Sequence, residues 1–107
     1  PDDYEILTQL GLVYAGLRNK EKAYEYIDRA SSVMPLSRDA LAGSNVLENK
    51  AIIYALFGDT KESLDLIEML MGMPSFVTPG TLRTNPLFSP LHGNKRFERL
   101  VEEKKTL

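Results

Sequence analysis

Apolar residues recur at steps of three and four through the first 74 positions, which is the periodicity of amphipathic helices. The first apolar stripe has four members: Leu7, Leu10, Tyr14 and Leu17. A polar turn at 18–20 follows it. A second stripe then runs toward Pro35 and has three members: Ala23, Ile27 and Ala30. The pattern predicts two consecutive helices joined by a short turn.

The same arrangement returns 40 residues further along the chain. Sliding the sequence by 40 superimposes identical or similar residues: Leu7 on Leu47, Leu12 on Ile52, Val13 on Ile53, Tyr14-Ala15 on Tyr54-Ala55, and Ile27 on Ile67. The second copy again has two stripes: Leu47, Ala51, Tyr54 and Phe57, then Leu64, Ile67 and Leu70. Between them, Gly58 suits a left-handed helix end, and Asp59 or Thr60 can cap the next helix. A second helix pair is therefore predicted before Gly72 and Pro74.

The first copy resembles a tetratricopeptide repeat, whose 34-residue pattern is W-x2-L-G-x2-Y, then A-x3-F, then P. The residues that carry the resemblance stand at the spacing of that pattern: Leu7, Leu10, Gly11, Tyr14, Ala23, Ile27, Ala30 and Pro35. The second copy has Lys50 in place of the usual leucine. The resemblance implies an all-α, right-handed helix-turn-helix solenoid of two repeats. Tyr14 and Tyr54 are expected to be largely buried at equivalent places, each on the first helix of its pair and facing the second.

The 40-residue offset exceeds the 34-residue period because residues 36–44 contain six extra positions. Ser37 is a good N-cap, and Asp39 in the first turn would interact favourably with the helix dipole. We expect the third helix to begin early, with an N-terminal extension of nearly two turns. Gly43-Ser44 either kinks this helix or separates a short turn from it.

Residues 75–107 do not repeat the pattern and are expected to form a helical C-terminal cap. Thr78-Pro79 has the form of an N-cap followed by proline at the first helical position. Asn85-Pro86 and Ser89-Pro90 are typical of helix stops or turn starts. Asn94 can cap a last helix, with Arg99 and Glu103 spaced for a pair on its surface. The apolar face of that helix has three members: Phe97, Leu100 and Val101.

This segment also resembles the ending of many multidomain bacterial tetratricopeptide proteins, L-R-x-D-P-x-[WF]-x-P-L-R-x-D-P-R-F. The corresponding stretch is Leu82-Arg83-Thr84-Asn85-Pro86-Leu87-Phe88-Ser89-Pro90-Leu91-His92-Gly93-Asn94-Lys95-Arg96-Phe97. The resemblance implies the C-terminal part of a larger bacterial protein, and a chain that opens on Pro1 fits that expectation. We expect one domain over 1–107, with repeats over about 4–37 and 38–77 and the cap over about 78–107.

The 107 residues include no cysteine and one histidine, His92. Disulfides, thiolate metal sites and cysteine nucleophiles are therefore excluded. No motif places a nucleophile or a carboxylate beside His92, so we expect no catalytic, cofactor-binding or metal-binding residues and a protein that is not an enzyme. Met69, Met71 and Met73 are expected to fill gaps beneath the C-terminal segment rather than to form a binding surface.

The net charge of −2 lacks the strongly basic face that is typical of nucleic-acid binding. Residues 75–107 carry a net positive charge and residues 1–74 a net negative charge. This difference favours docking of the C-terminal end on the acidic residues of the helices before it. The longest apolar runs, such as 51–57, are too short to cross a membrane, so no membrane insertion is expected. The cysteine count leaves the compartment open, and we favour the cytoplasm.

In tetratricopeptide domains, the first helix of each pair lines a concave face that binds ligands. The resemblance places eight residues on that face: Glu5, Thr8, Gln9, Leu12, Asn45, Glu48, Asn49 and Ile52. Gln9 and Asn49 are equivalent, and their primary amides offer donors and an acceptor to the backbone of an extended ligand. None of the eight residues is lysine or arginine. An uncharged or basic extended segment is therefore the expected ligand.

The expected function is a protein-interaction module that binds a peptide or partner protein on this concave face. The alternative is a structural terminus that seals a longer repeat array or self-associates as a homo-oligomer, with no ligand of its own. A C-terminal segment lying in the concave face would favour the alternative, because it would fill the space that a ligand needs.

Overall fold

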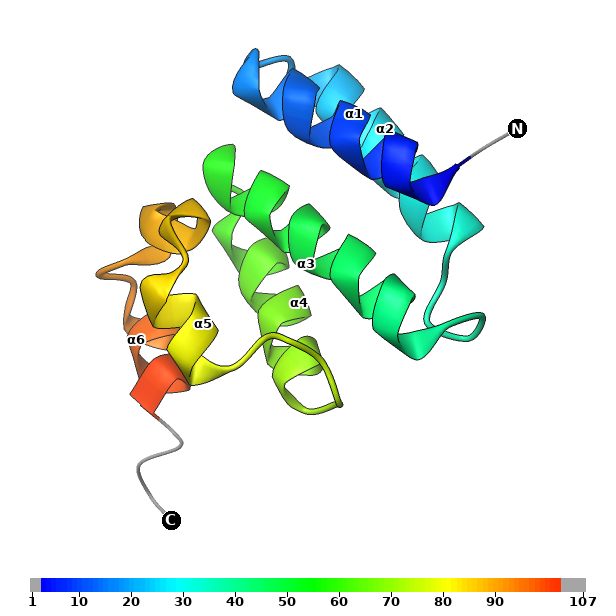
Figure 1. Cartoon of the computed structure of the whole chain (residues 1–107). Helices are drawn as coiled ribbons and strands as arrows, with labels where there is room; N and C mark the ends of the chain where they lie inside the picture. The colour runs from blue at the N-terminus through cyan, green and yellow to red at the C-terminus, as the bar shows by residue number, and fades with distance from the viewer. Residues whose placement is uncertain (1–2, 103–107) are drawn as a thin grey trace.

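Every element of the computed structural model, which describes residues 3–102, is helical (Figure 1). The elements in chain order are α1 (Tyr4–Gly16), α2 (Lys20–Val33), α3 (Ala40–Leu56), α4 (Thr60–Met71), α5 (Pro79–Thr84), the 3-10 helix η1 (Pro86–Leu91) and α6 (Lys95–Glu102). Helix α1 packs with α2, and α3 packs with α4. The C-terminal elements lie at the end of the molecule away from α1 (Figure 1). The prediction of an all-α chain is confirmed for this range.

The two helices of each pair cross at positions occupied by small residues. A Cβ added to Gly11 in α1 would lie 3.4 Å from the carbonyl oxygen of Ala23 in α2. In the second pair, 40 positions later, the Ser63 hydroxyl of α4 donates a hydrogen bond to the Ala51 carbonyl oxygen of α3 over 2.8 Å. Ala23, Ala51 and Ser63 are completely buried. Small side chains therefore let the backbones of both pairs pack at close range.

The turns that join the two helices within each pair, α1 to α2 and α3 to α4, have the same backbone geometry. Arg18 and Gly58 follow the two helix C-caps and have positive φ angles of 63° and 83°. The next residue of each turn donates its N–H five positions back over 2.9 Å: Asn19 to Tyr14, and Asp59 to Tyr54. The left-handed helix end predicted at Gly58 is confirmed, and the first turn adopts it at an arginine despite the steric cost. The 40-residue offset thus holds residue for residue through both turns.

Asp59 occupies the N-cap position of α4, but its side chain does not cap the helix as predicted. Its carboxylate instead accepts a hydrogen bond from the Tyr24 hydroxyl of α2 and lies 3.5 Å from the Nζ atom of Lys20. The Tyr24 hydrogen bond is the main cause that lowers the pKa of the Asp59 carboxyl. Asp59 therefore joins the first pair to the second, and this contact displaces the cap.

Tyr14 and Tyr54 are equivalent in the backbone turns but have different aromatic partners. The Tyr14 ring stacks on Tyr26 of α2 with the ring centroids 5.5 Å apart. The Tyr54 ring meets the edge of Tyr24, also on α2, with the centroids 5.2 Å apart. Both rings are partly buried rather than enclosed. The predicted equivalence of the two buried rings is therefore wrong, since Tyr54 meets a ring of the other pair. The rings diverge because α3 has a preceding pair to pack against, whereas α1 has none within residues 3–102.

The buried core consists of two clusters. The first joins α1, α2 and α3: Leu7, Ala15, Ala23, Ile27, Ala30, Val46 and Ile53. The second joins α3 and α4 to the C-terminal elements and includes Ile52, Ile67, Leu82, Phe88 and Phe97. Helix α1 turns Leu7 and Ala15 inward, whereas Leu17 is 69% exposed. The predicted inward stripe on the first helix is therefore wrong at Leu17.

Helix α3 is a single helix that starts later than predicted. Its N-cap is Asp39, whose Oδ1 accepts the Ala42 N–H over 2.9 Å, and Ser37 lies in the turn before it. The predicted cap at Ser37 is wrong because the chain first turns, with the N–H groups of Arg38 and Asp39 both donating to the Pro35 carbonyl. Gly43 does not end a separate turn. It lies inside α3 where the helix passes against the turn.

The C-terminal elements begin and end largely where the sequence predicts. Thr78 and Thr81 form a capping box around Pro79, and Asn94 Oδ1 accepts the Phe97 N–H over 3.0 Å. The predicted buried face is confirmed: Phe97, Leu100 and Val101. Ser89-Pro90 neither stops nor starts an element, because Pro90 lies inside η1. The expected partner of Arg99, Glu103, lies outside the described residues.

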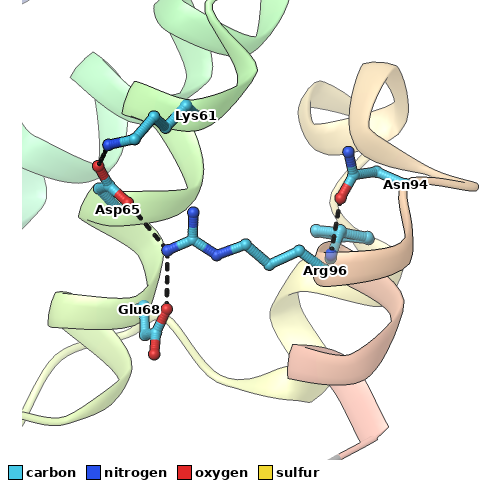
Figure 2. Close-up of polar contacts among 6 residues, drawn as sticks. Lys61, Asp65, Glu68, Asn94 and Arg96 are labelled. Atoms are coloured by element: carbon cyan, nitrogen blue, oxygen red, sulfur yellow. Dashed lines mark hydrogen bonds and ion pairs between the residues drawn. The ribbon is translucent and has the colours of Figure 1, made fainter.

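Arg96 ties the last helix to α4 (Figure 2). Its Nη2 atom donates to Asp65 Oδ1 over 2.9 Å and to Glu68 Oε1 over 2.8 Å. Lys61 donates to the other oxygen of Asp65 over 2.8 Å. The hydrogen bonds from Lys61 and then Arg96 lower the pKa of the Asp65 carboxyl. The basic C-terminal end thus docks on acidic residues of the second pair.

Gly43→Ala should lower the free energy of unfolding by about 1–3 kcal/mol, the usual cost of overpacking. A Cβ at Gly43 would lie 2.9 Å from the backbone nitrogen of Leu36, so the turn would have to move. The matched control is Gly16→Ala, where a Cβ meets no atom within 4 Å. This control should raise stability by up to about 1 kcal/mol. Urea denaturation of both variants measures the difference, and equal effects would contradict the close approach at Gly43.

Candidate functional site

An open groove of about 630 Å³ runs between α1 and α3. Six of the eight residues predicted for a concave face line it: Glu5, Thr8, Gln9, Leu12, Asn45 and Asn49. The remaining lining residues come from α1, the start of α3 and the loop after α4: Tyr4, Asp39, Leu41, Ala42 and Phe76. Two equivalent pairs at the offset of 40 residues, Glu5 with Asn45 and Gln9 with Asn49, therefore line one groove.

The groove offers two amides on its two walls. Gln9 is exposed on α1, and its side chain makes no hydrogen bond within residues 3–102. Asn49 donates one N–H to the Asn45 carbonyl of its own helix over 3.0 Å. This leaves Asn49 its second N–H and its amide oxygen. Both amides can therefore form hydrogen bonds with a molecule in the groove.

Thr8 lines the groove but does not offer its hydroxyl. The Thr8 Oγ1 donates to the Tyr4 carbonyl oxygen over 2.7 Å, and the residue is buried. Its role is therefore to close the floor of the groove, with Leu12 beside it as an apolar patch.

Two predicted residues, Glu48 and Ile52, do not line the groove. Ile52 is only 7% exposed and belongs to the same buried cluster as Val77, Leu82 and Phe88. The predicted apolar strip is therefore wrong at Ile52, because the C-terminal segment packs across this end of α3. Glu48 lies one helical turn from both Ser44 and Ile52, which are buried, and is itself partly buried.

Phe76 is a groove residue that the sequence pattern does not reveal. It lies in the loop between α4 and α5, and 62% of its surface is exposed. Its exposed ring adds apolar surface to the lining of the groove. Its place depends on the path of the loop in space, which no local periodicity encodes.

The charge in the groove is negative. Glu5 and Asp39 contribute carboxylates, and none of the lining residues within the described range is lysine or arginine. The Oδ1 atom of Asp39 accepts the Ala42 N–H, and the carboxylate keeps its negative charge. The groove therefore favours uncharged or basic groups over acidic ones.

The other chemical candidates are not assembled into a site. His92 is exposed, with its ring 5.6 Å from that of Phe97. Within residues 3–102, no group of three His, Asp or Glu side chains is placed to hold a metal ion. Met71 and Met73 pack against the second core cluster, whereas Met69 is exposed. No helix in the same range has both the length and the apolar character needed to cross a membrane.

Comparisons with models of protein families, with curated proteins and with solved structures give no significant match for this chain.

Glu48→Gln should raise the Tm at pH 7, and the gain should vanish as the pH is lowered toward 4. Burial raises the pKa of the Glu48 carboxyl above its ordinary 4.5, because desolvation disfavours the charged form. The stabilising contribution of protonated Glu48 is complete below the unfolded pKa and is lost as the pH rises through the folded pKa. Thermal unfolding across this pH range measures the effect.

The matched control for that series is Glu25→Gln on the exposed face of α2, which should leave the Tm unchanged. A Glu48→Gln gain that stays constant down to pH 4 would show that desolvation of the carboxylate is not its cause.

Proposed function

We propose that this chain is a non-enzymatic protein-interaction module that binds an extended peptide segment in the groove between α1 and α3. The observation that carries the proposal is the open groove itself, which gathers six residues selected from the sequence by their repeat positions. Two stacked helix pairs with matched turns support a tetratricopeptide-like arrangement, in which such a groove would be the concave face.

The chemistry of the groove suits the backbone of a peptide. Gln9 and Asn49 can each donate to a carbonyl oxygen and accept from an N–H group, so that they recognise peptide bonds without reading side-chain charge. Leu12, Leu41 and Phe76 add apolar surface for a side chain of the ligand. Extended peptides are recognised elsewhere by this combination of backbone hydrogen bonds and side-chain pockets.

The ligand is an uncharged or basic segment. Glu5 and Asp39 would repel an acidic tail, and the lining contains no cation to offset them. The energies involved are modest, since an exposed charge pair contributes about 1 kcal/mol or less. Charge therefore sets a preference among ligands, whereas the amides set the mode of binding.

The second candidate is a structural terminus that seals a longer helical array. The burial of Ile52 under the C-terminal segment favours this function, because η1 packs against α3 and already covers one end of the α3 face. Phe76 approaches the groove from the same segment but leaves the space between α1 and α3 open. We therefore place peptide binding first.

The double variant Gln9→Ala/Asn49→Ala should bind peptides about thirtyfold more weakly than the wild type, since the loss of two neutral hydrogen bonds costs about 2 kcal/mol. A peptide array that compares uncharged, basic and acidic sequences measures both affinity and preference. The matched control is Ser32→Ala/Ser37→Ala, which removes two exposed polar groups outside the groove. Selective binding of acidic C-terminal peptides, or equal binding by the double variant, would contradict the proposal.

Phe76→Ala should weaken binding of peptides with a large apolar side chain by about 1 kcal/mol or more, because the ring loses contact area with that side chain. Peptides of small polar residues should be affected less. Leu87→Ala is the control, since Leu87 is also a large exposed apolar residue but does not line the groove. Isothermal titration of the same peptides against both variants separates a groove contact from a general loss of surface hydrophobicity.

A further inference from the structure

Helix α1 carries an apolar stripe on its outer face. The stripe has four members one turn apart: Ile6, Leu10, Val13 and Leu17. Ile6 is 59% exposed, Val13 is 54% exposed and Leu17 is 69% exposed. A shallow hollow of about 260 Å³ lies over this face, with Ile6, Leu10 and Val13 among the residues that line it. Contiguous apolar surface of this kind marks an interaction site more often than scattered apolar residues do.

The same four positions in α3 form its contact with the preceding helix pair. The equivalents at the 40-residue offset are Val46, Lys50, Ile53 and Phe57. Val46 and Ile53 are at most 1% exposed and belong to the first core cluster, which includes Ala23, Ile27 and Ala30 of α2.

The other two residues of the four, Lys50 and Phe57, also contact α2. The Phe57 ring lies 5.8 Å from the ring of Tyr24, and the Lys50 Nζ atom lies 3.0 Å from Asp28 Oδ1. Both partners belong to α2. The four positions in α3 therefore define a docking face for a helix of the α2 type.

We infer that the outer face of α1 is the docking site for the second helix of a further helix pair, stacked on α1 as α2 is stacked on α3. The turns after α1 and α3 share a positive φ at Arg18 and Gly58 and the same backbone hydrogen bond, so α1 and α3 occupy corresponding places in their pairs. The exposed stripe on α1 is then the surface on which a further helix pair would dock. This surface is distinct in function from the peptide groove, although Glu5 and Gln9 border both.

A second copy of the chain cannot supply the docking helix. The alanine and isoleucine side chains of its α2 are already buried between α1 and α3. The corresponding face of its α4 is also covered, since Leu64, Ile67 and Leu70 lie in the cluster that includes the C-terminal elements. The occupant is therefore a helix from an additional pair whose own outer face is free.

The stripe also specifies the chemistry of that helix. Where α3 uses Lys50 to reach Asp28 of α2, α1 has Leu10. A docking helix should accordingly have small apolar residues like those of α2, but an apolar residue in place of Asp28. A carboxylate there would have no cation to pair with, and an apolar residue would instead contact Leu10. Because Asp28 keeps 59% of its side chain exposed at the existing junction, this sets a preference among docking helices.

A tandem protein tests the inference. An extra copy of residues 3–39 is fused to the N-terminus of the full chain, and Asp28→Leu is made in the extra copy only. The added α2 should dock on the stripe. We expect a higher urea midpoint than that of the chain alone, and hydrogen exchange of the α1 amides slowed by about tenfold or more. Restoring Asp28 in the added copy should reduce both effects, and combining it with Leu10→Lys in the full chain should recover them.

The variant Ile6→Asp/Val13→Asp in the full chain separates docking from stability. Without the added pair it should leave the urea midpoint unchanged, because both side chains are exposed, whereas in the tandem protein it should abolish the gain. Unchanged α1 exchange in the tandem protein would overturn the inference. So would sedimentation that shows the unfused chain dimerising through the stripe, with dimerisation lost in the Asp variant.

Discussion

The close crossing of small residues inside each helix pair is the contact on which the rest of the molecule depends. Gly11 against Ala23, and Ala51 against Ser63, bring two backbones to a distance that larger side chains would prevent. The close approach falls at the same repeat positions in both pairs. The equivalent residues Glu5 and Asn45, and Gln9 and Asn49, then line one groove between α1 and α3.

The C-terminal segment decides how much of that shared face stays open. It covers the end of α3 around Ile52 and is held against α4 by the contacts of Arg96 with Asp65 and Glu68. Over the first turns of α1 and α3 it contributes only Phe76. One segment thus seals the core at one end of the molecule and shapes the rim of the groove. Capping and ligand binding are compatible roles in this arrangement.

The position of the site was predictable in part. Its α1 and α3 residues follow from the repeat positions, because matched helices place matched residues on one face. The raised pKa of the Glu48 carboxyl was not predictable, since it follows from the burial of that side chain in the folded structure. The buried state of Ile52 was not predictable either, since it follows from a segment that is distant in sequence and packs over α3. Phe76 was missed for the same reason.

Local signals in the sequence determined the helices, the 40-residue offset and most of the caps, because periodicity, glycine at φ > 0 and N-cap residues act over a few positions. Tertiary structure alone decided which apolar face of α1 is buried. Leu7 is buried while Leu17 stays exposed, although both belong to the same predicted stripe. A periodic stripe identifies a face but not its partner, and the partner exists only where another helix arrives to cover it.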